Sequence, residues 1–276
     1  MNRSMIRFLI LTCWIPACGS DDEVAQAPAV QLSNDASLAP EVVKAASAIP
    51  SGLIPSPLEI ENAVRSAGVA PSLVSRVPAD RGYVVTADTH PDRVAIQTGV
   101  MLTDVILTAR TAPAADLAKR LGLVHTGLRA LGAESALLST VKEFENGIAG
   151  EVITREALLE EMARITDLMV PEKKWGPSPQ TGPLVQAGAW LAGVHMVAVT
   201  IIEADRIDAA DQLLKHPEVI GYFIGYVSMK NDAPSTIVHV LHERLEDLKV
   251  RTNKAELSRD DVQSIVSTTD GIFRQL

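Results

Sequence analysis

Residues 184–202 read LVQAGAWLAGVHMVAVTII and contain no charged side chain. A helix of this length approaches the ~20 residues that cross a bilayer. The stretch nevertheless contains the polar Gln186 and His195, and the acidic Glu203 follows directly. Its flanks also lack the Lys/Arg asymmetry that orients a membrane span. We therefore predict that the stretch is the buried central helix of a helical bundle.

Small residues repeat at a spacing of four along this stretch. Gly188 with Ala192, and Ala189 with Gly193, have this spacing, which leaves one helix face nearly bare backbone. Gly221 and Gly225 repeat the spacing in the next predicted helix. Because Gly costs ~1 kcal/mol in a helix interior, we expect the two bare faces to pack closely, with Trp190 filling space beside them. The alternative is that the bare face lines a ligand cleft.

Amphipathic patterns on both sides of this stretch predict further helices. Ser56 with Glu59, and Ser258 with Asp261, have the spacing of a capping box. Aromatic residues make up only 4% of the chain, so the core is left to aliphatic side chains, which suit packed helices better than a β-sandwich. We predict an all-α fold, a bundle or a stack of antiparallel helical hairpins with about eight or nine helices. The expected helices span residues 56–68, 91–110, 114–131, 134–148, 154–169, 184–202, 217–229, 237–250 and 258–273.

Charge and cysteine content exclude several classes of function. The formal net charge is −9, which argues against nucleic-acid binding because that function needs basic patches. The two cysteines, Cys13 and Cys18, both precede the predicted domain. The domain therefore has no disulfide and no cysteine-based metal site or nucleophile, and we expect no cofactor.

The first eighteen residues have the layout of a secretory signal. Arg3 and Arg7 precede an apolar run at residues 8–15, which is too short to span a membrane. The sequence Ile-Pro-Ala-Cys at residues 15–18 resembles a bacterial lipobox, in which the cysteine is diacylated and becomes the mature N-terminus, although Pro replaces the usual small residue. The alternative is an ordinary signal peptide with an incidental cysteine at Cys18.

These features predict three parts. They are a signal peptide at residues 1–17, the lipidated Cys18 with a flexible tether to residue 55, and a single helical domain at residues 56–276. The tether is rich in Pro, Ala and Ser, which disfavours independent folding. We expect a lipid-anchored protein of the bacterial cell envelope, on the periplasmic side or at the cell surface.

Two short motifs resemble landmarks of a family of uncharacterised helical lipoproteins, chiefly from Bacteroidetes. Residues 99–105, GVMLTDV, are similar to the family's Gly-Val-Tyr-x-Ala-Asp-Leu, with Met101 in place of Tyr. Residues 188–193, GAWLAG, are similar to Gly-Gly-Trp-x-Glu-Gly, with Ala192 in place of Glu. The resemblance covers about residues 55–205. It implies a helical fold and an envelope location, and the family has no assigned activity to transfer.

Asp104 and His195 are the candidates for a buried polar site. Asp104 is the only charged residue between positions 94 and 109, and a buried carboxylate must be paired or protonated. Gln97 and Thr108 share its helix face, so a polar stripe facing water or another helix is the favoured interpretation. His195 lies in the apolar stretch, where a hydrogen-bonded core histidine is the usual role.

Two other features are weaker candidates. His239 and His242 have a spacing that can chelate a metal, but they lie opposite the apolar stripe of their helix, so we favour a solvated face without metal. Trp175 lies in a loop dense in Pro and Gly at residues 171–183, either as an exposed contact residue or packed over the end of the bundle.

We expect a non-enzymatic binding or structural role in the envelope, with envelope proteins as the partners. One alternative is a hydrolase or metal-dependent enzyme that uses Asp104 or His195. Another is a carrier that holds a small apolar ligand between helices beside Gly188 and Gly193. The sequence contains no phosphate-binding loop and no nucleophile motif that would favour the enzyme.

Overall fold

Helices make up 78% of the residues that the computed structural model describes, which are 54–69, 85, 89–167, 176–178, 181–228 and 235–276. These residues contain ten α-helices and no strand, which confirms the predicted all-α fold. The helices are α2 (Pro57–Ser66), α3 (Pro91–Thr108), α4 (Ala114–Ala130), α5 (Ser135–Ala149), α6 (Arg155–Asp167), α7 (Thr181–Glu203), α8 (Ala210–Leu214), α9 (Pro217–Ser228), α10 (Thr236–Thr252) and α11 (Arg259–Phe273). The predicted signal peptide, Cys18, nearly all of the tether and Trp175 lie outside the described residues.

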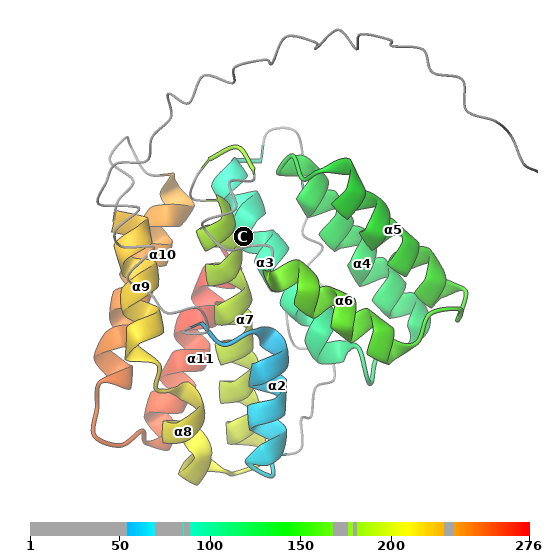
Figure 1. The fold of residues 1–276 in the computed structure, drawn as a ribbon. Helices are drawn as coiled ribbons and strands as arrows, with labels where there is room; N and C mark the ends of the chain where they lie inside the picture. The colour runs from blue at the N-terminus through cyan, green and yellow to red at the C-terminus, as the bar shows by residue number, and fades with distance from the viewer. Residues whose placement is uncertain (1–53, 70–84, 86–88, 168–175, 179–180, 229–234) are drawn as a thin grey trace, which may run out of the picture. The chain divides into compact units, whose positions relative to one another are not determined.

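Helix α7 lies at the centre of the bundle (Figure 1), and its most extensive contact is with α3. Helix α2 packs on both α3 and α7, and α11 packs on another side of α7. Helices α4 and α5 form a hairpin on the outer side of α3, while α9 and α10 pair with each other. Two helices that are far apart in sequence, α3 and α7, therefore form the framework on which the others assemble.

Local sequence signals set where several helices begin. The Ser56 hydroxyl accepts from the Glu59 N–H at 3.2 Å, and the Glu59 carboxylate accepts from the Ser56 N–H at 2.7 Å. A second capping box closes the start of α11. The prediction for α7 was wrong by one turn, since the helix begins at Thr181 within the expected loop. Pro183 is compatible with this start because first-turn residues need no intrahelical N–H donor.

The close approach of α3 and α7 depends on two glycines. A Cβ atom added to Gly99 would fall within 3.0 Å of the Val185 carbonyl oxygen, and one added to Gly188 would fall within 3.0 Å of the Ile96 carbonyl oxygen. The Thr103 hydroxyl donates to the Ala189 carbonyl at 3.0 Å across the same contact. The backbones of the two helices are therefore nearly in contact.

The expected packing between Gly188 and the glycines of α9 was wrong. A Cβ atom at Gly221 or Gly225 would meet no atom within 4 Å in the part of the chain that the structure describes. The bare face of α7 is instead covered by α3, and Gly193 lies against the Ile60 side chain of α2. The spacing of small residues shows that one face of a helix is bare, but it does not show which helix covers that face. Here α3 covers it, because Gly99 provides the small residue that lets the two backbones approach.

One helix among the described residues, α7, is long and apolar enough to cross a membrane by length and composition. The mean hydropathy of its most apolar window is 1.6, and 83% of that window is buried inside the domain. Its position against α2, α3 and α11 is the position predicted for a central bundle helix.

The capping box of α11 has a consequence for the dependence of stability on pH. Hydrogen bonds from Lys254 and then from Ser258 lower the pKa of Asp261 from 3.8 to about 2. Because the folded-state pKa is the lower one, the carboxylate stabilises the fold above pH 3.8, and this contribution is lost as pH falls through about 2.

We expect the free energy of unfolding, measured by denaturant titration, to decrease across this interval. Asp261→Asn should flatten the decrease, and an Asp261→Asn curve as steep as that of the unmodified chain would contradict the assignment. Asp260→Asn, which removes an exposed neighbouring charge, is the control.

Candidate functional site

Asp104 of α3 is part of a buried ion pair. Its side chain is 1% exposed and pairs with Arg120 of α4, whose side chain is 10% exposed. Thr108 donates its hydroxyl to the Asp104 carbonyl at 2.6 Å, and Gln97 donates to the Leu276 carbonyl. Gln97, Asp104 and Thr108 therefore face protein rather than water, and Asp104 joins α3 to α4.

Sequence reasoning missed Arg120, although a signal was present. Arg120 lies between Leu117 and Val124 on the buried face of α4. A single cation within an apolar stripe, and a single anion within another one, are partners that can neutralise each other. The two isolated charges of neighbouring helices could have been matched on that ground.

His195 of α7 is held by α11. Its Nδ1 lies 2.8 Å from the Thr269 hydroxyl, and the ring packs edge-on against Phe273 with 5.3 Å between ring centroids. Thr269 donates its one hydroxyl proton to backbone carbonyls, including that of Ile265 at 2.9 Å. Either atom can be the donor between His195 Nδ1 and the Thr269 hydroxyl, depending on the tautomer of the ring. This geometry gives His195 a structural contact between two helices.

The structure does not bring Asp104 and His195 into one site. Asp104 points to α4, whereas His195 points to α11. Within the described ranges, no three His, Cys, Asp or Glu side chains form a group that could hold a metal ion. The convergent polar cleft that a hydrolase or metal enzyme needs is therefore not assembled from these residues.

The two histidines of α10 lie toward its outer side. His239 is exposed and its Nε2 lies 3.4 Å from the Glu243 carboxylate, while His242 is half-buried. An exposed pair of this kind contributes little to stability.

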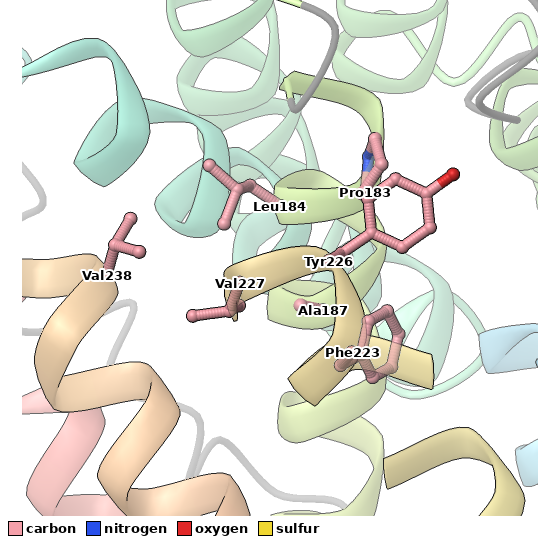
Figure 2. A pocket seen from close by; sticks show the side chains of 7 residues that line it. All are labelled: Pro183, Leu184, Ala187, Phe223, Tyr226, Val227 and Val238. Atoms are coloured by element: carbon pink, nitrogen blue, oxygen red, sulfur yellow. The ribbon is translucent and has the colours of Figure 1, made fainter. Parts of the chain in front are cut away.

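An apolar pocket of about 280 Å³, including space open to solvent, lies between α7, α9 and α10 (Figure 2). Phe223 and Tyr226 form its α9 side, and Leu184 lies on the α7 side. Behind Phe223 is Trp190, which is 1% exposed, with 5.7 Å between the two ring centroids. Trp190 therefore supports the pocket wall from the core. We name this feature the α9 pocket.

A second pocket of about 250 Å³, including space open to solvent, lies between α2, α3 and α7. Gly193 and Val197 of α7 line it together with Val64 and Glu61 of α2. Glu61 is 3% exposed, which is unusual for a carboxylate, and sequence reasoning did not select it. The available signal was its place beside the buried Ile60 and Val64 positions of an amphipathic helix. We name this feature the Glu61 pocket.

Glu61 has one oxygen with two cationic partners and one without a partner. Its Oε1 accepts from Arg65 Nη2 at 2.6 Å and lies 3.3 Å from Arg110 Nε. Its Oε2 is buried and has no hydrogen-bond partner among the residues that the structure describes. A buried acceptor of this kind is costly to leave unsatisfied, so it marks a place where a further donor would be stabilised.

Comparison of the chain with models of protein families, with curated proteins and with solved structures found no match. The resemblance of residues 99–105 and 188–193 to a lipoprotein family therefore stays a prediction, and function must be inferred from the geometry.

Proposed function

We propose that this chain is a lipoprotein of a bacterial cell envelope whose helical domain binds an envelope protein and catalyses no reaction. The observation that carries the binding role is the outer face of α9. Added Cβ atoms at Gly221 and Gly225 would meet no atom of the described residues within 4 Å, and Tyr222 and Ile224 beside them are only partly buried. The α9 pocket is formed by the same helix.

The composition of α9 is typical of a contact surface. Its 12 residues include a single charged side chain, Glu218. Exposed apolar surface and aromatic side chains are common where proteins bind one another. The absence of side chains at Gly221 and Gly225 would let a second helix approach the α9 backbone closely. The partner is accordingly expected to present an apolar or amphipathic helix.

The polar residues of the core support a non-enzymatic role. Asp104 is neutralised by Arg120, and His195 is bound to Thr269. Both side chains are thus used in holding helices together, and neither lines either pocket. A binding domain needs such contacts for a rigid surface, whereas an enzyme needs reactive groups that face a substrate.

Membrane attachment would come from Cys18. The net charge of −9 gives the chain no attraction to anionic lipid headgroups. A diacylated cysteine supplies two acyl chains, which is the number that stable anchoring requires. The predicted tether would then let the domain reach a partner from the membrane surface.

A photo-crosslinking experiment in the native envelope tests this proposal. The full chain carries p-benzoylphenylalanine in place of Tyr222, and the expected result is one discrete crosslinked adduct of higher mass. The same group in place of Val152, which is 81% exposed elsewhere on the domain, is the matched control and should not form that adduct. Gly225→Leu in the Tyr222 chain adds a side chain in open space and should abolish the adduct without unfolding the domain.

Fractionation of the same cells tests the lipid anchor. Cys18→Ser should move the chain from the membrane fraction to the soluble fraction. An adduct that forms equally from Val152, or that survives Gly225→Leu, would refute the α9 contact. A Cys18→Ser chain that stays in the membrane fraction would refute lipid anchoring.

A further inference from the structure

Helix α11 packs on the central helix α7 (Figure 1), and a buried histidine lies in the contact between them. The His195 side chain is 6% exposed, and its two neighbours on α11, Thr269 and Phe273, are also buried. Nδ1 of His195 lies 2.8 Å from the Thr269 hydroxyl, and its ring packs edge-on against Phe273. We name this arrangement the α11 contact. It places an ionisable side chain between two helices that are far apart in the sequence.

Protonation of His195 would put a positive charge into the α11 contact. Histidine is the side chain whose charge ordinarily changes between pH 5 and 8. Burial disfavours the charged form because the cation loses its hydration, and neither Thr269 nor Phe273 carries a charge that could balance it. If α11 separates from α7, the imidazole meets water and takes up its proton without this cost. Acid therefore favours the separated helices over the packed ones.

The carboxylates on the helices around the α11 contact have partners of their own. On α11 and on α10, which packs against it, the partners are Arg274 for Asp270, Lys254 for Asp261 and Arg251 for Asp247. On the other elements that pack on α7, they are Arg120 for Asp104, Ser235 for Asp92, Arg65 for Glu61, Lys215 for Asp211 and Arg206 for Asp208. Glu203 of α7 lies about two turns beyond His195, and Glu218 of α9 is exposed. Carboxylates that already have partners offset little of the cost of a charge at His195.

We propose that the α11 contact is sensitive to pH, so that protonation of His195 in mildly acidic surroundings releases α11 from α7. Release would expose Leu191 and Ala198, which are buried one turn before and one turn after His195 on the same face of α7. This inference does not depend on the proposed envelope partner, because neither His195 nor Thr269 lines the α9 pocket.

Hydrogen exchange of backbone amides in the full chain, measured at pH 7 and at pH 5, tests the inference. Protection factors remove the pH dependence of intrinsic exchange, so they report the opening of each helix. An imidazole in water has a pKa of about 6.5. If His195 stays neutral while α11 is packed, opening of α11 becomes about 25-fold more favourable at pH 5 than at pH 7. The protection of the α11 amides should fall by this factor. The amides of α5, which packs on α4 rather than on α7, should change far less.

Two matched substitutions assign the effect to His195. His195→Gln keeps a neutral side chain with a donor and an acceptor, so the α11 amides should have the same protection at both pH values. His239→Gln removes an exposed histidine of α10 and should leave the 25-fold fall intact.

The ring signals of labelled histidine in the unmodified chain give a second measurement, which does not require the His195→Gln chain to fold. In the packed state at pH 5, the His195 ring should keep the NMR signals of a neutral imidazole, whereas the exposed His239 ring should be protonated.

Three results would overturn the inference. The first is equal protection of the α11 amides at pH 7 and pH 5. The second is a fall of the same size in the His195→Gln chain or in the amides of α5. The third is a His195 ring that titrates together with His239 in the packed state. None of these results bears on crosslinking at Tyr222, so failure of this inference and failure of the proposed function are distinguishable.

Discussion

Gly99→Ala is expected to lower the free energy of unfolding by about 3 kcal/mol, the upper end of what overpacking a core usually costs. The added methyl group would fall within 3.0 Å of the Val185 carbonyl oxygen, an atom of the α7 backbone. A backbone atom cannot turn aside as a flexible side chain can, so the central helix pair must separate. Separation would also weaken the Thr103 hydrogen bond to Ala189.

Thermal unfolding followed by circular dichroism measures this loss. For a domain of this size, about 3 kcal/mol corresponds to a decrease in Tm of roughly 6–12 °C. Gly221→Ala and Gly225→Ala are matched controls, since their added methyl groups would meet no atom of the described ranges within 4 Å. Each control should leave stability unchanged or raise it by about 0.5–1 kcal/mol through helix propensity. Equal losses at Gly99 and Gly221 would show that α3 and α7 are not packed backbone to backbone.

Arg120→Met is expected to destabilise the domain by about 3–5 kcal/mol, because it leaves Asp104 buried and charged without its cation. Asp104→Leu should cost a similar amount by stranding the guanidinium of Arg120. The double substitution removes both charges and places two apolar side chains between α3 and α4, so it should recover most of the loss.

Denaturant unfolding of the two single variants and the double variant measures the coupling between these side chains. Arg164→Met is the control, because it breaks an exposed pair with Glu161 on α6 and should have a far smaller effect. Additive losses in the double variant would contradict a direct ion pair between Asp104 and Arg120.

The positions of the helices could be predicted because their signals are local. The capping boxes at Ser56 and Ser258 and the apolar stripe of α4 each depend on residues within one or two turns. Helix α8 was not predicted, since its five residues are too few to show a period. The early start of α7 was missed because Pro183 suggests a loop but is equally acceptable in a first helical turn.

Pairing between helices could not be predicted in the same way. Gly188 identifies a bare face on α7, yet nothing in its neighbourhood specifies that Gly99 rather than Gly221 meets that face. Likewise, the partner of His195 is Thr269, which lies 74 residues away in the chain. Such contacts depend on which helices become neighbours in the fold. The periodicity of a single helix carries no information about its neighbours.

The candidate pockets depend on this same long-range packing. Glu61 and Gly193 are far apart in the sequence. They line the same pocket only because α2 packs on both α3 and α7. The sequence shows Glu61 as an ordinary helical acid beside Arg65. Its buried, half-satisfied state arises from Arg110 and from the α7 surface above it.

The place of α11 beside α7 affects how the chain reaches its folded state. Synthesis delivers a protein from its N-terminus, so α3 and α7 are available before α11. Until α11 arrives, His195 and the apolar residues around it lack the Thr269 and Phe273 contacts that cover them. Such an intermediate exposes hydrophobic surface to chaperones and proteases. A chain that ends before residue 259 is therefore expected to keep this surface exposed.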